Sequence, residues 1–496
     1  MAELLHDLLD TAAGEHPDAI AVHHRDDAQT YRQLQATSRR LASWLTGAGV
    51  RRGDRVIIAL PVDVMLPALL YACSRIGGVF VVLRPELPET TAAHILEDAE
   101  PVLLISDAAG LRALAHRAGI AHRGLGDLRL AARSHPALPT PRGPLAVDPA
   151  CFIYTSGSTG TPKAVVSPHA QIIFALRAIQ SELAYRPDDI VFCALPLAFD
   201  YGLYQIFLCT LAAAELRLAT AAGSGQRLLA ELCQAGATVL PAVPPLALAL
   251  ARLLSRPAAG RPPLRLLTNT GAAMPQHLLK ELRSLLPGLQ VQLMFGLTEC
   301  KRAAIMPKDE DLRRPGACGR ALPGTEIYAV DEDGTRLPPD RIGELVVRGP
   351  HVMAGYWRRP ELTAQRFPRA EGLFPLLRTG DYGRLDSEGY LYFAGRRDDL
   401  YKERGFRVST IEVEAAAHRI DGVREAAVLP PAAHEEGALL LVVGDLTPQE
   451  VLDRLRHELE DIKMPARCVA VPALPVNANG KIDRGELVRL AGAGRD

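Results

Sequence analysis

The sequence predicts an α/β fold: a large N-terminal domain of helix-covered sheets with a β-barrel-like subdomain, followed by a small α+β domain. The chain has 496 residues, which is more than one compact core accommodates. Up to about Thr325, short apolar runs alternate with segments of helical periodicity, a pattern typical of parallel sheets covered by helices. Beyond Thr325, strand-like runs are joined by glycine-rich turns, and the residues after Gly395 look like a separate unit.

The N-terminal elements follow from apolar spacing and from turn-forming residues. Tyr31–Thr46 and His169–Ala184 have the spacing of helices. The stretch His135–Pro149 contains proline and glycine and predicts a loop before a new unit. The strand-like runs between the helices are Arg55–Leu60, Val79–Leu83, Val102–Ile105, Cys151–Tyr154 and Arg265–Thr268.

The later elements rest on the same signals. Ile342–Arg348 and Tyr390–Ala394 are the strand-like runs of the β-barrel-like region. The final unit combines a helix near Pro448–Leu459 with three strand-like runs, at Glu425–Leu429, Ala438–Val443 and Arg467–Val471.

Composition excludes several classes of protein. Hydrophobic residues make up 48% and charged residues 23% of the chain, and the net charge is -1 with both signs well mixed. No global basic field exists to attract nucleic acid or an anionic membrane, so neither is expected as a partner. Charged residues and prolines interrupt every apolar stretch before it reaches the ~20 residues of a membrane span.

The eight cysteines have no metal-ligand spacing, and most lie in apolar runs, so we expect buried free thiols. The first ten residues, MAELLHDLLD, carry acids where a signal peptide has basic and then apolar residues. Together these observations favour the reducing cytoplasm.

A candidate phosphate-binding loop covers residues 154–163, Tyr-Thr-Ser-Gly-Ser-Thr-Gly-Thr-Pro-Lys, after a strand-like run and before a helix-like run. Its glycines allow close backbone approach, and its lysine adds a cation, so the loop can wrap the phosphates of ATP. A P-loop NTPase or a kinase is excluded because Pro162 precedes Lys163 and no Gly-Lys-Ser/Thr follows. The ATP-binding candidates here are Thr155, Ser156, Gly157, Ser158, Thr159, Gly160 and Lys163.

The decapeptide resembles the signature loop of the adenylate-forming superfamily, which contains acyl-CoA synthetases, luciferases and the adenylation domains of nonribosomal peptide synthetases. The resemblance covers nearly the whole chain, because further motifs follow in order. It implies ATP-dependent activation of a carboxylic acid to an acyl-adenylate, with Mg²⁺, release of pyrophosphate and then transfer to a thiol with release of AMP.

Two motifs resemble the adenine and metal motifs of the superfamily. In Thr270–Pro275, Gly271 and Ala272 would contact the purine, although a plain strand-to-helix turn explains this short motif equally well. In Met294–Glu299, the resemblance implies that Phe295 packs on adenine beside Gly296, that Thr298 binds the α-phosphate and that Glu299 holds Mg²⁺. A carboxylate together with phosphate oxygens suits that cation.

The segment Arg378–Arg407 resembles the ribose site and hinge of the superfamily. Asp381 and Arg396 would bind ribose, since a carboxylate can accept from both hydroxyls, and Arg407 is an anion contact. Asp398 would be the hinge about which a mobile small domain rotates, and Gly405 would border the thiol tunnel. The resemblance therefore implies two domains, residues 1–397 and residues 398–496.

Asn477–Asp483 resembles the catalytic-lysine motif. Lys481 would contact the substrate carboxylate and the α-phosphate. A carboxylate that attacks a phosphate must overcome like-charge repulsion, which a positioned ammonium offsets.

The expected acyl pocket includes Phe199, Asp200 and Tyr201. In amino-acid-activating relatives an aspartate after phenylalanine pairs with the substrate ammonium, but the same segment also resembles acyl-CoA ligases that bind none. After Glu299, Lys301 and Arg302 offer a cation for a second substrate carboxylate, as in the similar β-amino-acid ligases of macrolactam pathways. A solvated cation is the alternative.

The resemblance is closest to a stand-alone ligase that loads an amino acid or a β-amino acid onto the phosphopantetheine of a separate carrier protein. The alternative is an acyl- or aryl-CoA ligase with CoA as acceptor. Luciferase-like oxidation uses the same motifs and is disfavoured by its rarity. A nucleotide sensor that has lost catalysis is disfavoured because Lys481 and Glu299 are both present.

Overall fold

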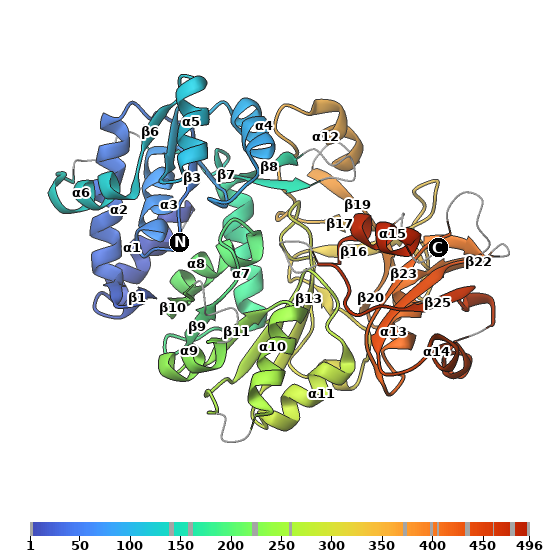
Figure 1. The fold of residues 1–496 in the computed structure, drawn as a ribbon. Coiled ribbons are helices and arrows are strands. Elements are labelled where there is room, and N and C mark those ends of the chain that lie inside the picture. Colours follow the sequence, from blue (N-terminus) through green and yellow to red (C-terminus); the bar gives the residue numbers. More distant parts are fainter. Residues whose placement is uncertain are drawn as a thin grey trace.

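The structure is a computed structural model, and it describes residues 3–137, 143–156, 162–220, 227–256, 260–370, 374–396, 400–403, 406–431, 437–459, 461–476 and 482–493. Figure 1 shows two large sheets with their helices on the N-terminal side and a smaller C-terminal unit at the opposite end. The predicted α/β fold class is confirmed.

One sheet has six strands in the order β6-β5-β3-β4-β7-β8. All neighbouring pairs are parallel except β7 and β8, which form an antiparallel hairpin. The inner strands β3, β4 and β5 are short, mostly apolar and buried runs, as is typical of a parallel sheet covered by helices. The bounds are β3 Arg55–Ala59, β4 Val79–Val82, β5 Leu103–Ser106, β6 Ala121–Arg123, β7 Pro149–Ser156 and β8 Pro162–Pro168.

The second sheet has nine strands in the order β15-β14-β13-β12-β11-β9-β10-β1-β2. From β13 to β1 the neighbours are parallel, and antiparallel strands complete the two edges. The bounds are β1 Ile20–His24, β2 Asp27–Thr30, β9 Ile190–Cys193, β10 Glu215–Leu218, β11 Val239–Ala242, β12 Leu266–Asn269, β13 Gln290–Phe295, β14 Ala304–Ile305 and β15 Arg320–Ala321.

The parallel order of this sheet determines where a site can form. The segments that follow β9, β12 and β13 leave the carboxyl ends of strands in one parallel block, and such ends lie at one edge of a sheet. These segments contain Asp200, Gly271 and Glu299, so the fold brings three motifs to one edge.

The helices covering these sheets are α1 Leu5–Glu15, α2 Tyr31–Gly47, α3 Met65–Ile76, α4 Glu89–Ala99, α5 Ala109–Arg117, α6 Leu125–Ser134, α7 His169–Leu183, α8 Asp200–Ala212, α9 Leu228–Ala235, α10 Pro244–Leu254 and α11 Gln276–Leu285. Helix α8 is buried on nearly every side, which explains its continuous apolar sequence.

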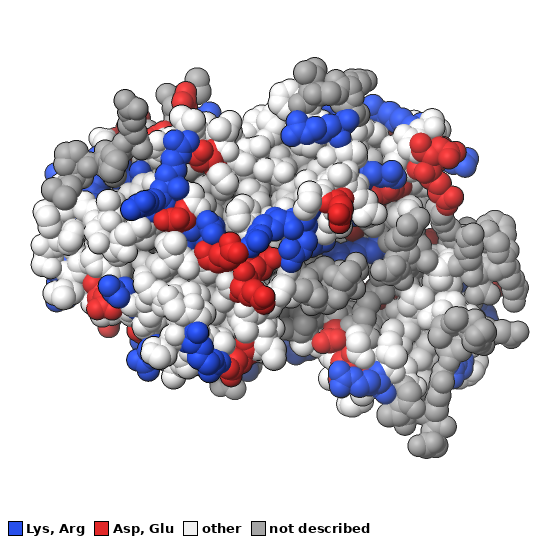
Figure 2. All heavy atoms as spheres, turned by 90° about the horizontal axis from the view of Figure 1, so that it is seen from above, with Lys and Arg blue, Asp and Glu red and all other residues white. Residues whose placement is uncertain are grey.

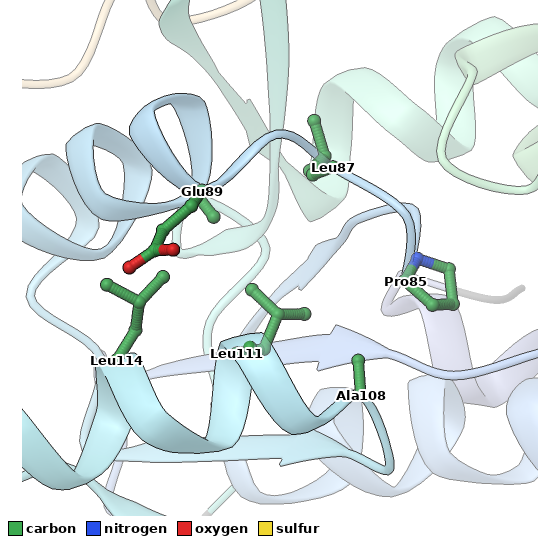
Figure 3. A pocket seen from close by; sticks show the side chains of 8 residues that line it. Pro85, Leu87, Glu89, Ala108, Leu111 and Leu114 are labelled. Atoms are coloured by element: carbon green, nitrogen blue, oxygen red, sulfur yellow. The ribbon is translucent and has the colours of Figure 1, made fainter.

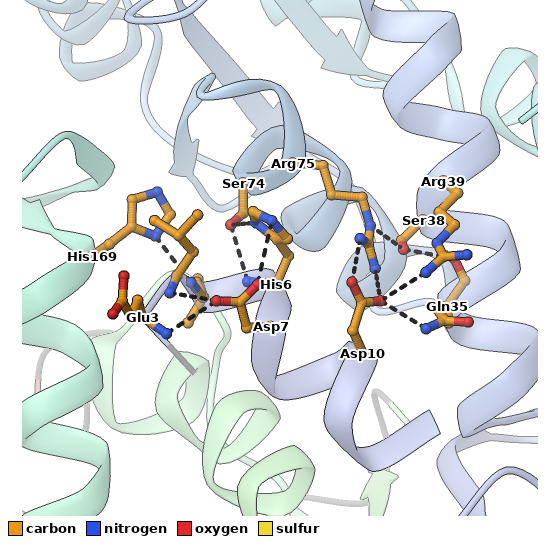
Figure 4. A network of polar contacts seen from close by, with 12 residues as sticks. Glu3, His6, Asp7, Asp10, Gln35, Ser38, Arg39, Ser74, Arg75 and His169 are labelled. Atoms are coloured by element: carbon orange, nitrogen blue, oxygen red, sulfur yellow. Dashed lines mark hydrogen bonds and ion pairs between the residues drawn. The ribbon is translucent and has the colours of Figure 1, made fainter. Parts of the chain in front are cut away.

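The first helix is held by a buried ion pair that Figure 4 shows. Arg75 donates to both carboxylate oxygens of Asp10, at 2.9 and 2.6 Å, and to Ser38 Oγ at 3.0 Å. Burial raises the pKa of Asp10, but the Arg75 hydrogen bonds and charge outweigh burial, and the resulting pKa is below the usual range. Beside this pair, His169 Nδ1 accepts from the backbone N–H of Leu5 at 3.1 Å.

The region expected to be barrel-like contains a five-stranded antiparallel sheet in the order β16-β17-β19-β18, with β20 on β19. The predicted strands Ile342–Arg348 and Tyr390–Ala394 are confirmed as β17 and β20. The bounds are β16 Glu326–Val330, β17 Gly343–Arg348, β18 Arg369–Ala370, β19 Phe374–Leu385, β20 Leu391–Arg396 and α12 Pro360–Arg366, with a 3₁₀ turn at Glu310–Leu312.

The C-terminal unit is a small α+β arrangement with a hairpin and a three-stranded sheet, β23-β24-β25. Tyr401 is buried in its core with Val408 and Val413. The predicted boundary at residues 397 and 398 falls outside the described residues and stays a prediction. The bounds are β21 Leu400–Glu403, β22 Phe406–Ser409, α13 Thr410–Ala417, β23 Val423–Leu429, β24 Leu439–Gly444, α14 Pro448–Leu455, β25 Arg467–Ala470 and α15 Arg484–Ala493, with a 3₁₀ turn at Asp461–Lys463.

The expectation of free and mostly buried cysteine thiols is met. All eight cysteines are free, and five of them are buried. Among the helices that the structure describes, none is long and apolar enough to cross a membrane. On the face that Figure 2 shows, acidic and basic side chains lie next to one another and do not separate by sign.

Candidate adenylate site

The phosphate-loop candidate connects β7 to β8. Thr155 pairs with Lys163 across the hairpin, and Ser156 pairs with Pro162. The sequence indicated a helix directly after the loop, but β8 comes first and α7 follows it. Gly157, Ser158, Thr159 and Gly160 lie outside the described residues. Thr155 Oγ1 is buried and has no hydrogen-bond partner among the described residues. Buried polar atoms are usually hydrogen-bonded, so this hydroxyl is a candidate to bind a ligand.

Lys163 lies over an aromatic ring that sequence reasoning did not identify. Its Nζ is 4.3 Å from the ring centroid of Tyr356. Burial lowers the pKa of Lys163, while the Glu299 charge raises it and Arg366 and Arg396 lower it. The burial of this ammonium and the two nearby guanidiniums favour an anionic ligand such as phosphate.

Glu299 is bound by the same tyrosine. Tyr356 donates its hydroxyl to Glu299 Oε1 at 2.6 Å, and Met353 N–H donates to the backbone oxygen of Glu299 at 2.9 Å. Burial, followed by the Glu299 charge, raises the pKa of Tyr356, so its hydroxyl stays a donor at neutral pH. Thr298, the preceding residue, is half-buried.

The donor set fits Mg²⁺ as a partner of ATP. The described residues contain no cluster of three or more His, Cys, Asp or Glu that could hold a metal alone. Glu299 is 7% exposed and offers a carboxylate whose Oε1 is oriented by Tyr356. Mg²⁺ is usually bound through one or two carboxylates, substrate phosphates and water, so a single glutamate suffices.

Gly296 is required by the turn that follows β13. A Cβ at this position would lie 2.1 Å from Lys301 O and 2.8 Å from Arg302 Cα, closer than atoms can approach. Phe295, one residue earlier, is 9% exposed and its ring lies 5.5 Å from that of Phe393. Lys301 itself has φ +65°, a left-handed conformation rarely adopted by a residue with a side chain.

The turn directs two cations into the interior. Lys301 is 0% exposed, and its Nζ contacts Ser167 Oγ at 3.2 Å and lies 5.4 Å from the ring centroid of Tyr204. Arg302 is 5% exposed and donates from Nη1 to the backbone oxygen of Lys301 at 2.8 Å. The alternative of a solvated cation is therefore wrong for both residues.

Asp200 opens helix α8 on the other side of this cluster. It is 5% exposed, and its Oδ2 is 3.6 Å from Arg302 Nη1. Tyr201 next to it shares a hydrogen bond of 2.7 Å with Thr268, and its ring lies under the Arg302 guanidinium at 4.8 Å. Phe199 precedes the helix and packs edge-on against Tyr201. Asp200 and Tyr201, two of the acyl-pocket candidates, thus lie against Arg302, the residue next to Lys301.

The ribose candidates face each other across two strands. Asp381 on β19 pairs with Arg396 on β20, and Arg396 Nε is 3.4 Å from Asp381 Oδ1. The Thr-Gly-Asp motif is part of a strand and not a plain turn. Gly380 has φ +67° at a register shift between β17 and β19, so the strand bulges directly before Asp381.

The remaining candidates are placed only in part. Gly271, with φ +89°, and Ala272 follow β12 and are half-buried. Arg407 lies on β22, opposite Lys402. Lys481, Asp398 and Gly405 lie outside the described residues, and their roles stay predictions.

Three residues that contact the site were missed by sequence reasoning. Ser167 and Tyr204 hold Lys301, and Tyr356 connects Glu299 with Lys163. No local motif marks them. Ser167 is one residue from the end of β8, and its role depends on a lysine 134 positions away.

A pocket shown in Figure 3 lies elsewhere, between α4 and α5. It is lined mainly by apolar side chains, among them Leu87, Leu111 and Leu114. It contains none of the predicted site residues, and Glu89 on its rim pairs with Arg117 at 2.6 Å.

Comparisons with known proteins show the family of this chain. A family profile described as AMP-binding enzyme matches residues 9–357, and the AMP-binding enzyme C-terminal domain matches residues 412–481. The L-proline--[L-prolyl-carrier protein] ligase of Pseudomonas fluorescens is 30% identical, with 98% of this chain and 99% of that protein covered. A feruloyl-CoA synthase from Amycolatopsis is 30% identical over 96% of each chain. This chain also matches one of the plipastatin synthase proteins of Bacillus subtilis, 30% identical over 99% of this chain, but spans only 14% of that longer protein.

Solved structures share the fold. ATP-bound MatB from Rhodopseudomonas palustris has a TM-score of 0.89 at 29% identity, with all of both chains covered. VinN is 41% identical with a TM-score of 0.74, over 79% of this chain and 98% of that one. A complex of VinN with L-aspartate matches over the same shares, at 40% identity and a TM-score of 0.73. The chain therefore belongs to the AMP-binding enzyme family and is an adenylate-forming ligase of the ATP-dependent acid–thiol class.

Proposed function

We propose that this ligase activates an amino acid that carries a second carboxylate, an aspartate-like or β-amino acid, and transfers it to the phosphopantetheine thiol of a carrier protein. The observation that supports the proposal is the burial of Asp200, Lys301 and Arg302 in one cluster. We place the reaction in the cytoplasm, and we expect neither nucleic acid nor membrane as a partner.

The charges of this cluster do not balance. The charge of Glu299 also acts on Lys301, but Glu299 is assigned to Mg²⁺ in this proposal. The carboxylate that remains, Asp200, faces one guanidinium and one ammonium, which leaves an excess of one positive charge when Lys301 is protonated. Burial lowers the pKa of Lys301, with the nearby Cys151 and Asp200 opposing that shift, because an ammonium is costly in a dry interior. An anionic ligand offsets this cost.

A dicarboxylic amino acid supplies the missing charge. Its ammonium suits Asp200, and its second carboxylate suits Lys301 and Arg302, while the reacting carboxylate faces ATP. The separation of 3.6 Å between Asp200 and Arg302 exceeds a good hydrogen bond, so Asp200 retains acceptor capacity for an ammonium. VinN, whose complex contains L-aspartate, is the relative that supports this substrate class.

The chemistry has two steps. In the first, a carboxylate oxygen attacks the α-phosphorus of ATP and pyrophosphate leaves. Lys481 offsets the repulsion between the two anions, Thr298 donates to the α-phosphate, and Glu299 holds the cation. Mg²⁺, when bound, neutralises charge on the phosphate oxygens. In the second, the thiol sulfur attacks the acyl carbonyl, the thiol proton is lost and AMP leaves.

The acceptor is proposed from the stand-alone carrier-protein ligase among the relatives. The second candidate is a CoA ligase that acts on an acid without an amine, since a feruloyl-CoA synthase is equally similar. The three buried charges favour the first candidate, because an apolar acyl chain would not supply the anion that offsets their excess positive charge.

A transfer assay tests the proposed acceptor. The ligase is incubated with ATP, Mg²⁺ and L-aspartate, and then with a holo peptidyl carrier domain, its apo form or CoA. Intact-mass spectrometry should show aspartyl mass on the holo domain and none on the apo domain. Formation of the CoA thioester alone would identify CoA as the acceptor and contradict the proposed carrier protein.

A further inference from the structure

A short segment, residues 354–357, lies between the two parts of the nucleotide site, Lys163 on β8 and Glu299 after β13. Residues 354–357 run beside β8 in an antiparallel manner: Ala354 N–H donates to Val166 O, Val166 N–H to Gly355 O, and Trp357 N–H to Ala164 O, at 2.9 to 3.1 Å. We call this segment the strap. Since β8 contains Lys163, these hydrogen bonds fix the position of the strap relative to the strand that contains Lys163.

The strap is also attached to the metal side of the site. Met353, directly before it, donates from its N–H to Glu299 O. Its far end is held by Asp98, whose backbone oxygen accepts from Trp357 Nε1 at 3.0 Å and whose carboxylate accepts from Arg359 at 2.8 Å. Gly355 has φ +119° and lies close to Thr363. A Cβ at position 355 would lie 2.4 Å from Thr363 Cγ2, so only glycine fits at this point of the strap.

Tyr356 is the strap residue that contacts both ATP-binding groups by its side chain. The hydroxyl binds Glu299 Oε1 at 2.6 Å, and the ring face lies 4.3 Å from Lys163 Nζ. The ring is 5% exposed and packs edge-on against Phe367 with 5.4 Å between centroids, which fixes its orientation. One hydroxyl and one ring face of the same rigid side chain thus determine the positions of a carboxylate and an ammonium.

We infer that Tyr356 is a positioning residue that orients Glu299 toward the metal through its hydroxyl and holds Lys163 at the phosphates through its ring. The inference rests on the proposed function, in which Glu299 holds Mg²⁺ and Lys163 contacts phosphate. Hydrogen-bond partners of metal ligands typically change metal affinity by about 10–100-fold. The two contacts act on different ligands, so they can be separated by substitution.

The first variant is Tyr356→Phe, which keeps the ring and removes the hydroxyl. We measure binding of a non-hydrolysable ATP analogue by calorimetry, in EDTA and across a Mg²⁺ titration. The Mg²⁺ concentration at half-saturation should rise about tenfold, while affinity for the analogue in EDTA stays within about twofold of the parent. The second variant, Tyr356→Leu, also removes the ring and should weaken binding in EDTA by about threefold or more.

The matched control is Tyr390→Phe. Tyr390 also lies against cations, with Arg314 at 4.0 Å and Arg320 at 4.2 Å from its ring, and among the described residues neither of these cations is a predicted nucleotide contact. This control should keep the parent Mg²⁺ dependence. A Tyr356→Phe variant with parent Mg²⁺ dependence overturns the inference, as does equal loss of binding with and without Mg²⁺.

A double substitution separates positioning from a general loss of packing. If Tyr356 acts through Glu299, adding Tyr356→Phe to Glu299→Gln should cost less than about twofold further in Mg²⁺ half-saturation. Fully additive losses overturn the inference. If Tyr356→Phe does not fold, Glu299→Gln in the parent still tests the metal role, and a parent-like Mg²⁺ response overturns it. A parent protein that does not bind the analogue with Mg²⁺ at all contradicts the proposed function instead.

Discussion

Arg302 lies 3.6 Å from Asp200, so the carboxylate expected to bind a substrate ammonium already faces a guanidinium at the start of helix α8. The guanidinium lies on the ring of Tyr201, which fixes its plane. A site for a simple amino acid would need only the aspartate. Under the proposed function the added cations pair with further negative charge on the substrate, and the first predictions test this relationship.

Asp200→Asn should lower kcat/KM for the amino acid about a hundredfold, or about 2.7 kcal/mol, because the substrate ammonium would lose its counter-charge. ATP affinity should stay unchanged, since no nucleotide contact is removed. Asp311→Asn is a matched control, because Asp311 is equally buried and is paired with Arg283 away from the site. Equal effects of both substitutions on amino-acid activation would show that Asp200 has only a structural role.

Lys301→Met should raise the free energy of unfolding by roughly 0–4 kcal/mol. The reason is that an apolar chain of similar length replaces a buried ammonium that contacts one hydrogen-bonding side chain, Ser167. The same substitution should reduce the preference for L-aspartate over L-asparagine by about tenfold or more, roughly the size of one charged contact. Urea denaturation and competitive adenylation assays give the two results. A clear loss of stability with the preference intact would place Lys301 outside the substrate site.

Lys481→Ala should remove adenylate formation but leave transfer from a supplied aminoacyl-adenylate largely intact. The physical reason is that the ammonium offsets charge only during attack on the α-phosphate, and the resemblance implies that the small domain rotates before thiol attack. Rapid-quench measurement of each half-reaction provides the comparison. Equal loss in both halves is incompatible with the proposed two-conformation cycle.

Stability should fall as pH is lowered from about 6.5 to 4. Burial lowers the pKa of His6, His169, His351 and His418 to about 4 in each case, so these rings stay neutral in the folded chain. The unfolded chain takes up their protons below about 6.5, the ordinary pKa of histidine, and acid therefore favours unfolding. Above that pH these groups make no pH-dependent contribution.

The substitution His169→Gln tests this pH dependence. The glutamine oxygen can still accept from Leu5 N–H, and the slope of unfolding free energy against pH should fall by up to about 1.4 kcal/mol per pH unit. His116→Gln, at an exposed position of α5, is the control for the loss of one histidine. Identical slopes for both variants and the parent would mean that His169 is protonated in the folded protein.

Most of the regular elements could be predicted because their physical causes are local. Strands such as β3, Arg55–Ala59, are apolar on both faces, and α2 begins at Tyr31 after Thr30, which caps it. The hairpin strand β8 was missed, because Pro162 and the glycines before it look like a helix entry and its partner strand is needed to identify it. Helix α14 ends at Leu455, four residues before the predicted end.

Site residues that belong to a local motif could be predicted from the sequence. Site residues whose role depends on contacts with distant parts of the chain could not. Asp200 and Glu299 were found by pattern. Whether Lys301 points inward depends on its positive φ and on the close approach at Gly296, and neither is visible in the sequence. Tyr356 contacts Glu299 across 57 positions, and only the assembled strap reveals it.

The central claim is tested most directly by ATP–pyrophosphate exchange across a panel of acids: L-aspartate, a β-amino dicarboxylic acid, L-asparagine, apolar α-amino acids, aryl acids and fatty acids. The account predicts the strongest exchange with an acidic amino acid and at least about tenfold less with the amide, as expected when a buried charge is left unpaired. Exchange only with acids that lack an amine would contradict it and would place the protein among acyl- or aryl-CoA ligases, with Asp200 paired to Arg302 for structural reasons.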